Sequence, residues 1–399
     1  MATVTFEQAR QIVEREVRSR RLLPRVETAA LGEAAGRVLA EAVAADRDYP
    51  PFDRSTRDGF AVRAAETPGT LQVIGQVRAG EEFAGAAAPG EAVEIMTGAP
   101  VPAGTDAVAM VEYTRREGDR VVVERGAGPG ENVVLRGSEI AAGVAAIEPG
   151  RRLDYPEIAL LASFGRETAA VFRRPQVAIL STGDEVVEVG ETPLAYQIRN
   201  SNAYSLAAQV RRAGGEPVVL PIAPDEPRRT RELVEQGLGT DLLLLSGGVS
   251  MGKYDLVEGV LAELGAEFYF DGVLIQPGRP LVFGRTGETF FFGLPGNPLS
   301  TMATFEVFAR AAVELLAGAC EAPLRFLQAR LAADFRHKTG LTRFLPAVVS
   351  GPPEQPSVSP VRWQGSGDVA ALTRSNAYLV AAADRAEWKA GEWMPVLPR

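Results

Sequence analysis

The sequence has few of the residues that build the commonest catalytic and metal sites. It contains one cysteine, Cys320, and one histidine, His337, among 399 residues. A single cysteine excludes an intramolecular disulfide and cysteine-rich metal sites, and a single histidine leaves few ways to build a histidine-based triad or zinc site. Of the 42 lysine and arginine residues only three are lysines, which limits Schiff-base chemistry to three side chains. Catalysis therefore has to rest on carboxylates, hydroxyls, backbone amides, arginines or a hard metal ion.

Long apolar runs are also missing. No stretch approaches 18 consecutive apolar residues, and the first residues lack the charged-then-apolar pattern of a targeting signal. We therefore expect a cytoplasmic protein that does not enter membranes. The net charge of −9 argues against a general nucleic-acid-binding protein, although a local arginine patch could hold a phosphorylated small molecule.

Length and local patterns predict several domains. A chain of 399 residues exceeds one ordinary core. Thr5 and Gln8 form a capping-box pattern that predicts a helix at the N-terminus, and a second, alanine-rich helix is expected over 29–42. Short β-type runs separated by glycine and proline follow from about 50 to 136, and helical spacing returns at 155–162. A small β domain is therefore expected to interrupt a helical one.

Residues 176–320 have the most regular pattern, in which apolar strands alternate with helices. The helices are expected to begin at the caps Asn202 and Asp225, at Leu256 and at Pro298. This predicts a doubly wound, mostly parallel sheet with helices on both faces, and the short strands beyond it predict a barrel or sandwich. We therefore expect a multidomain α/β protein with a discontinuous helical linker domain (1–45 and 137–175), an inserted β domain (46–136), a central α/β domain (176–320) and a C-terminal β domain (321–399).

Polar and glycine-rich loops follow four of the predicted strands. Ligands bind beyond the carboxyl ends of strands in doubly wound sheets, so the loops at 181–185, 221–225, 246–255 and 293–300 should converge. Ser246-Gly247-Gly248 at a helix start is a credible anion cradle, although a tight glycine turn has the same pattern. The segment also fits part of a P-loop, but Tyr254 stands where that motif needs serine or threonine, so we reject that interpretation.

Four carboxylates lie in these loops: Asp184, Glu185, Asp225 and Asp255. Carboxylates bind Mg²⁺ or act as bases that orient water. Helix capping is at least as good an explanation for Asp225.

Other features favour structural explanations when each is taken alone. The segments 50–62 and 96–102 are dense in polar residues, but such loops are surface turns more often than sites. His337 has no partner with ligand spacing, and Cys320 is most simply a small packing residue.

Several motifs together resemble the molybdopterin molybdenumtransferases, the MoeA type that includes the E domain of gephyrin. Residues 50–61 resemble the family's P-P-F-D-x-S-x-x-D-G-[YF]-A signature, and residues 95–102 resemble its I-x-T-G-A-x-[VL]-P turn. The resemblance covers essentially the whole chain. Its other motifs are Ser181-Thr182-Gly183-Asp184-Glu185, 246–255, Pro277-Gly278-Arg279-Pro280, Leu294-Pro295-Gly296-Asn297-Pro298, Gly365-Ser366-Gly367 and Asn376.

This resemblance implies molybdenum cofactor biosynthesis by an elongated homodimer with its active cleft between subunits. Molybdate would be inserted into adenylylated molybdopterin with release of AMP, Mg²⁺ would be the cofactor, and the molybdopterin adenylyltransferase would be a contact partner. The implied catalytic residues are Asp58, Thr97, Glu185, Asp225 and Asp255. The implied metal ligands are Asp184, Glu185, Asp225, Asp255 and Glu139. The implied substrate-binding residues are Asp184, Ser246, Gly247, Gly248, Ser250, Arg279, Pro295, Pro298 and Ser366.

The chain departs from the family's pattern near the anion-handling positions. Arg54 and Arg57 replace the usual asparagine and methionine, and Glu139 stands where aspartate is expected. Gln276 and Arg279 stand where the family has lysines. Two other functions therefore stay open: insertion of tungstate on the same framework, and a non-catalytic scaffold or sensor that keeps the fold. The intact acidic residues favour catalysis, because a scaffold has no physical need to retain them.

Overall fold

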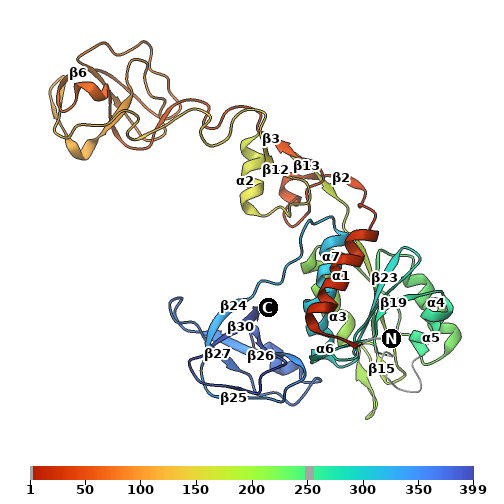
Figure 1. Cartoon of the computed structure of the whole chain (residues 1–399). Helices are drawn as coiled ribbons and strands as arrows, with labels where there is room; N and C mark the ends of the chain where they lie inside the picture. Colours follow the sequence, from red (N-terminus) through yellow and green to blue (C-terminus); the bar gives the residue numbers. More distant parts are fainter. Residues whose placement is uncertain (1–2, 248–255) are drawn as a thin grey trace. The chain divides into compact units, whose positions relative to one another are not determined.

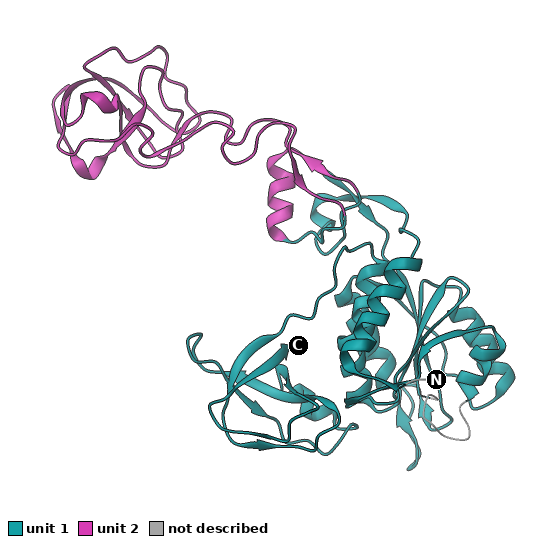
Figure 2. Ribbon diagram, viewed as in Figure 1, with its two compact units in different colours: residues 1–40, 150–154, 168–399 teal, residues 41–149, 155–167 magenta. Residues whose placement is uncertain are grey.

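The computed structural model describes residues 3–247 and 256–399. The chain divides into two compact units, coloured separately in Figure 2: residues 1–40, 150–154 and 168–399 form unit 1, and residues 41–149 and 155–167 form unit 2. The finer division into four domains stays a prediction. In the described ranges no helix combines the length and the apolar character that crossing a membrane requires.

The core of unit 1 is a six-stranded sheet in the order β17-β14-β18-β23-β22-β19. The first four strands run parallel, and the β22–β19 edge is antiparallel. Because strand side chains alternate between faces, Val177 and Ile179 join one apolar core while Ala178 and Leu180 join another. The predicted mostly parallel sheet is confirmed. Its strands are β14 (Gln176–Ser181), β17 (Glu216–Val219), β18 (Leu242–Ser246), β19 (Glu267–Phe270), β22 (Val282–Thr286) and β23 (Thr289–Leu294).

Helices cover both faces of this sheet, as Figure 1 shows. Helices α1, α3 and the continuous α6–η4–α7 pack on one face, and α4 and α5 pack on the other. The predicted capping box of Thr5 and Gln8 is present, and the predicted long helix from Pro298 contains one π-helical turn, η4. The bounds are α1 (Phe6–Arg20), α3 (Ser201–Ala213), α4 (Pro227–Gly237), α5 (Leu256–Glu263), α6 (Pro298–Thr304), η4 (Phe305–Ala309) and α7 (Arg310–Leu316).

Arg10 joins α1 to the π-helical turn. Its guanidinium donates to the carbonyl oxygens of Val307 at 2.9 Å and Ala322 at 2.8 Å, and it forms an ion pair with Glu14. Arg10 is 8% exposed, and this burial lowers its pKa from the ordinary value. A π-helical turn disturbs the regular backbone ladder, so a buried donor at the carbonyl of Val307 stabilises it. Helix α1 therefore packs against the α/β core, with Ala9, Val13 and Val17 in one of its apolar clusters.

The predicted helix over 29–42 is wrong. Val26–Ala30 form strand β2, which pairs antiparallel with β13 (Thr168–Phe172), and the 3-10 turn η1 (Leu31–Glu33) follows. Gly36 then adopts a φ of +78°, a left-handed conformation that a helix does not continue through. Alanine permits either structure, and pairing with a strand far along the chain overrides its helix propensity.

Unit 2 contains the predicted small β domain. Its six strands have the order β8-β5-β7-β6-β10-β9, with β6 and β7 parallel and the other neighbours antiparallel. The predicted helix at 155–162 is confirmed as α2 (Tyr155–Ser163). The other bounds are β3 (Val43–Ala44), β4 (Arg54–Ser55), β5 (Gly59–Val62), η2 (Ala64–Glu66), β6 (Gly69–Val77), β7 (Glu91–Ile95), β8 (Ala107–Met110), η3 (Val111–Tyr113), β9 (Thr114–Glu117), β10 (Arg120–Val123), β11 (Val133–Val134) and β12 (Ala145–Ile147).

The C-terminal region closes into a five-stranded barrel. Strands β26, β27, β24, β30 and β28 pair in this order, and β28 pairs back with β26. The sequence left barrel and sandwich open, and this closure identifies a barrel. Strand β21 pairs with β26 and so joins the barrel to the α/β core. The bounds are β21 (Ile275–Gln276), β24 (Leu327–Leu331), β25 (Phe335–Arg336), β26 (Thr342–Ser350), β27 (Ser357–Pro360), α8 (Val369–Thr373), β28 (Ala377–Ala381), β29 (Glu387–Trp388) and β30 (Trp393–Pro398), with β1 (Thr3–Val4), β15 (Val186–Val187), β16 (Ile198–Arg199) and β20 (Gly272–Val273) elsewhere in unit 1.

Candidate functional site

Loops at the carboxyl ends of β14, β18 and β23 enclose a cavity of about 270 Å³, here called the strand-end cavity. The three strands end side by side, because Ser181 pairs with Ser246 and Ser246 pairs with Leu294. The loop after β17 joins this edge through the N–H of Gly183, which donates to the carbonyl of Ala223 at 3.1 Å. The predicted convergence of the loops is confirmed for their described residues. The cavity is lined by Ser181, Thr182, Glu185, Val186, Ile198, Arg199, Asn200, Ser201, Asn202, Ser246, Gly247, Gly296, Asn297 and Pro298.

Glycine allows the ends of β14 and β18 to approach closely. Gly247 has a φ of +95°, in the left-handed region that favours glycine. A Cβ atom at Gly247 would lie 2.8 Å from the carbonyl oxygen of Thr182 and 3.0 Å from its Oγ1. The predicted Ser-Gly-Gly turn therefore has a position at which glycine is sterically required, and its third residue, Gly248, lies outside the described residues.

A buried asparagine anchors α3 at the cavity. The Oδ1 atom of Asn200 accepts from the hydroxyl of Ser181 at 2.9 Å and from the N–H of Ala203 at 3.2 Å. Asn200 is therefore the N-cap of α3. The predicted cap Asn202 is wrong, because the helix begins two residues earlier in the chain.

Asn202 instead connects α3 to two strand ends. Its Nδ2 donates to the hydroxyl of Ser246 and to the carbonyl of Gly296, both at 2.8 Å. Sequence reasoning placed Ser181 and Thr182 in a converging loop without a role, and it missed the cavity positions of Asn200 and Asn202. The polar run around Asn200, directly before a predicted helix on the same sheet edge, was the signal that could have found them.

The predicted acidic residues occupy different places on this edge. All three of Asp184, Glu185 and Asp225 are exposed, but only Glu185 lines the cavity. The Oδ1 atom of Asp184 accepts from the backbone N–H of Asp225 at 3.0 Å. Glu226, not Asp225, caps α4, because its carboxylate accepts from the first N–H groups of that helix. The capping explanation for Asp225 is therefore wrong, and its carboxylate is left available for another role.

The remaining predicted residues of unit 1 lie around the cavity or outside the described ranges. Pro298 lines the cavity at the first position of α6, and the buried Pro295 accepts at its carbonyl from the Thr301 hydroxyl. The carbonyl of Ser366 accepts from the N–H of Leu299 at 2.9 Å, so a barrel loop contacts the first turn of α6. The side chain of Arg279 is exposed and does not line the cavity. The predicted residues Gly248, Ser250 and Asp255 lie outside the described residues.

In unit 2, Asp58 and Thr97 are in direct contact. Asp58 Oδ1 accepts from the backbone N–H of Thr97 at 2.6 Å and from its hydroxyl at 2.8 Å. These two hydrogen bonds, the backbone one first, lower the pKa of the Asp58 carboxyl. The two loops that carry the family signatures thus meet at an ionised carboxylate.

Glu139 and Arg54 also meet in unit 2. Their side chains form an ion pair at 2.6 Å, and both are about half exposed. Arg54, which replaces the family's usual asparagine, therefore neutralises Glu139, which stands where aspartate is expected. This ion pair makes Glu139 a weaker candidate for a metal ligand.

Metal-binding capacity is limited in the described part of the chain. No group of three or more histidine, cysteine, aspartate or glutamate side chains is placed there to hold a metal ion. Mg²⁺ commonly uses one or two carboxylates together with substrate phosphates. The Asp184–Asp225 loops and Glu185 offer carboxylates of this kind.

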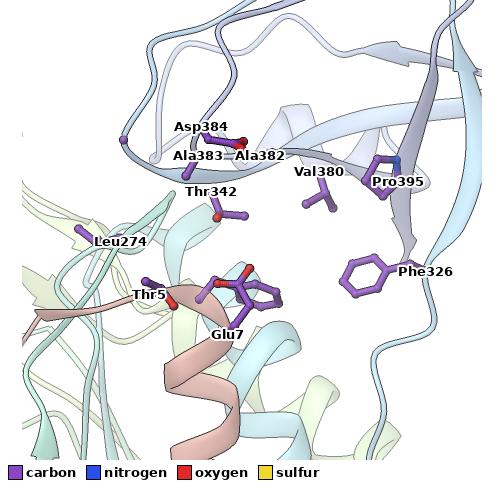
Figure 3. A pocket seen from close by; sticks show the side chains of 12 residues that line it. Thr5, Glu7, Leu274, Phe326, Thr342, Val380, Ala382, Ala383, Asp384 and Pro395 are labelled. Atoms are coloured by element: carbon purple, nitrogen blue, oxygen red, sulfur yellow. The ribbon is translucent and has the colours of Figure 1, made fainter.

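A second cavity, of about 460 Å³, lies between the start of α1 and the barrel, as Figure 3 shows. Phe326, Val380 and Pro395 contribute apolar surface to it, and Glu7 and Asp384 contribute carboxylates. None of the predicted site residues lines it. The strand-end cavity, with its converging polar groups, is the better candidate for chemistry.

Comparison with known proteins covers nearly the whole chain. Residues 4–165 match the MoeA N-terminal region (domain I and II), residues 178–315 a probable molybdopterin binding domain, and residues 328–398 the MoeA C-terminal region (domain IV). A molybdopterin molybdenumtransferase of Nostoc sp. is 38% identical over 299 residues, which cover 72% of this chain and 69% of the relative. One of Staphylococcus aureus is 30% identical over 396 residues, which cover 97% and 94%. The chain belongs to the molybdopterin molybdenumtransferase family.

A solved structure supports the same assignment. The molybdopterin biosynthesis moeA protein from Pyrococcus horikoshii OT3 superposes with a TM-score of 0.81 at 29% identity, over 100% of both chains. The resemblance read from the motifs is confirmed, and this molybdenumtransferase acts in molybdenum cofactor biosynthesis. Its strand-end cavity lies within the part that matches the probable molybdopterin binding domain.

Proposed function

We propose that this molybdenumtransferase inserts molybdate into adenylylated molybdopterin and releases AMP. The observation that carries the proposal is the strand-end cavity, which is built by residues of the probable molybdopterin binding domain. Its size and its converging hydroxyl, amide and carboxylate groups suit a polar part of such a substrate. In the reaction, water cleaves the phosphoanhydride bond to AMP. The two dithiolene sulfurs replace two molybdate oxygens, which leave as water after taking up protons.

The contacts of the acidic residues support distinct roles. Glu185 lines the cavity, where a carboxylate can orient the attacking water. Asp58 has a lowered pKa because Thr97 donates two hydrogen bonds to it, so it stays ionised near neutral pH and is a weak proton acceptor there. We assign the Asp58–Thr97 pair to orientation of a donor group or a cation. Asp255 lies outside the described residues, so its catalytic role stays a prediction.

We also propose Mg²⁺ as the cofactor. One or two of the carboxylates of Asp184, Glu185 and Asp225 would hold it, with substrate phosphate oxygens completing the shell. When bound, the ion neutralises charge that develops on phosphate oxygens. The hydrogen bond from the Asp225 N–H to the Asp184 carboxylate connects the loops after β14 and β17, which carry these residues.

We further propose a cytoplasmic homodimer that receives its substrate from the molybdopterin adenylyltransferase. Large apolar side chains are exposed along 189–204, beside the cavity, and patches of this kind often mark protein interfaces. Light scattering with size-exclusion chromatography tests the dimer. The exposed side chains are Val189, Leu194, Tyr196, Ile198 and Tyr204.

Turnover is tested with purified protein, adenylylated molybdopterin, molybdate and Mg²⁺, following AMP release. Glu185→Gln should abolish most turnover. Glu188→Gln is the matched control, because Glu188 is an exposed glutamate of the same segment that does not line the cavity. Equal AMP release by both variants would remove Glu185 from the chemistry.

Two alternatives give different results in the same assay. A tungstate-inserting enzyme would release AMP faster with tungstate than with molybdate. A scaffold or sensor would bind adenylylated molybdopterin without releasing AMP above background.

A further inference from the structure

The second cavity, of about 460 Å³ between α1 and the barrel, carries two carboxylates, and no described lysine, arginine or histidine lines it. Glu7 comes from the first turn of α1, and Asp384 comes from the barrel loop after β28, as Figure 3 shows. Both side chains are exposed, and neither forms an ion pair with any residue that the structure describes. The neighbouring Arg385 pairs with Glu392 at 2.6 Å instead. The cavity therefore presents two negative charges without a counterion from the described chain.

Most of the remaining lining is apolar. In Figure 3, Phe326, Val380 and Pro395 lie to one side of both carboxylates. Phe326 is 40% exposed, so a bound molecule can cover its ring. Phe6 also lines the cavity, and its ring packs edge-on against that of Phe344 with 5.3 Å between the centroids. The apolar wall is therefore already formed by the packing of α1 against the barrel.

This combination excludes several classes of ligand. Mg²⁺ and Ca²⁺ take a shell of oxygen atoms, and the apolar wall offers none. An anion would be repelled by both carboxylates. A neutral apolar molecule would take water from the carboxylates without giving them a partner, which costs free energy. The volume lies within the roughly 300–1,000 Å³ that is usual for sites of small molecules.

We propose that the second cavity binds a small organic cation, in which an ammonium or guanidinium group is attached to an aliphatic or aromatic body. The cationic group pairs with Glu7 and Asp384, and the body covers the apolar side chains of Phe326, Val380 and Pro395. Such a ligand bridges α1 and the barrel, so its binding should raise the melting temperature. The two cavities share no lining residue, so this site goes beyond the proposed function and does not depend on it.

The test measures binding of three compounds that share one ring and differ in charge, by NMR titration of the full-length chain. Tryptamine carries an ammonium group, tryptophol has a hydroxyl in its place, and indole-3-propionate has a carboxylate. Tryptamine should bind saturably with a Kd of about 1 mM or below, which is ordinary for a ligand of this size. Tryptophol should bind about tenfold more weakly, and indole-3-propionate more weakly still. Added salt should weaken tryptamine and leave tryptophol unchanged.

Two kinds of variant separate the charge from the apolar wall. Glu7→Gln and Asp384→Asn should each weaken tryptamine about threefold, and the double variant about tenfold, because single ion pairs at exposed sites are weak. None of these variants should change the affinity for tryptophol. Phe326→Ala should weaken tryptamine and tryptophol by the same factor, because it removes apolar contact area from both.

Glu354→Gln is the matched control. Glu354 is an exposed glutamate of the barrel that forms no ion pair with the described residues and does not line the cavity. This variant should leave all three affinities unchanged. Melting temperatures of the free variants check that each of them folds.

The outcomes decide the inference without reference to AMP release. It is overturned by tryptamine that does not bind saturably, or by a double variant that binds tryptamine as tightly as the wild type. Tryptophol or indole-3-propionate that binds as tightly as tryptamine would show a neutral or anionic ligand and would also overturn it. Tryptamine binding that depends on both carboxylates supports the inference whether or not the protein releases AMP, so the proposed function stands or falls by its own assay.

Discussion

Gly247→Ala tests whether the close approach of the β14 and β18 ends builds the strand-end cavity. The φ of Gly247 is +95°, and an added Cβ would lie 2.8 Å from the carbonyl oxygen of Thr182. That oxygen belongs to backbone held on both sides, since the N–H of Thr182 donates to the Ser246 carbonyl at 3.1 Å and Thr182 bridges to Ala223. The alanine methyl group therefore has to displace backbone, not a flexible side-chain end.

The expected loss has two parts. A left-handed conformation costs an alanine about 1–2 kcal/mol. Overpacking against an immobile backbone costs about 1–3 kcal/mol. Together they should lower the free energy of unfolding of the α/β core by about 2–5 kcal/mol. A displacement of about 1 Å in a site that positions a substrate can reduce turnover about 100-fold.

Two other glycines serve as controls. A Cβ at Gly296, in the same cavity, would lie 3.5 Å from Gly247 Cα, an ordinary contact, so Gly296→Ala should be nearly neutral for stability. Gly259 lies inside α5 with open space around it, so Gly259→Ala should stabilise by about 0.5–1 kcal/mol. Urea unfolding and AMP release are measured for all three variants. A Gly247→Ala protein with wild-type stability and turnover would refute the steric argument.

Three further predictions concern residues away from this turn. Arg10→Met should lower the free energy of unfolding by about 3 kcal/mol, because it leaves the Val307 carbonyl without its buried donor; an unchanged urea midpoint would contradict this. Thr97→Val should reduce AMP release about tenfold by removing one donor to Asp58, with an unchanged melting temperature as the check on folding. The pKa of Asp58 is lowered in the folded protein, so its ionised form contributes to the free energy of unfolding in full above the ordinary aspartate value of about 3.9. This contribution is lost as the pH falls through the lowered pKa. Turnover between pH 5 and 8 should therefore show no titration of Asp58. Asp225→Asn should fold normally and lose turnover, and retained turnover would remove this residue from the site.

The central sheet was predictable because its signal is local and strong. Strands that are apolar on both faces, such as Leu242–Ser246, occur where helices cover a parallel sheet on both sides. Parallel strands in turn force their carboxyl-end loops to one edge, so the position of the candidate site follows from the strand pattern. The family motifs then add residue types at that edge, including Glu185 and Gly247 in the cavity lining.

Features that depend on distant pairing were not predictable. The alanine-rich segment 29–42 looks helical in isolation, but β2 pairs with β13, more than a hundred residues later. Helix α1 was correctly placed by its capping box, yet nothing in that box shows that Arg10 reaches Val307, 297 positions along the chain. Propensity describes a segment, whereas these contacts depend on where the rest of the chain returns.

The contacts of Asn202 at the sheet edge also depend on distant parts of the chain. Its Nδ2 donates to the hydroxyl of Ser246 and to the carbonyl of Gly296, which are 44 and 94 positions away along the chain. The strand-end cavity, of about 270 Å³, is smaller than the whole adenylylated substrate proposed for it. Asp184 and Asp225 also lie outside the cavity, exposed on neighbouring loops of the same edge. A substrate held in the cavity would therefore extend its phosphates toward the carboxylates proposed for Mg²⁺.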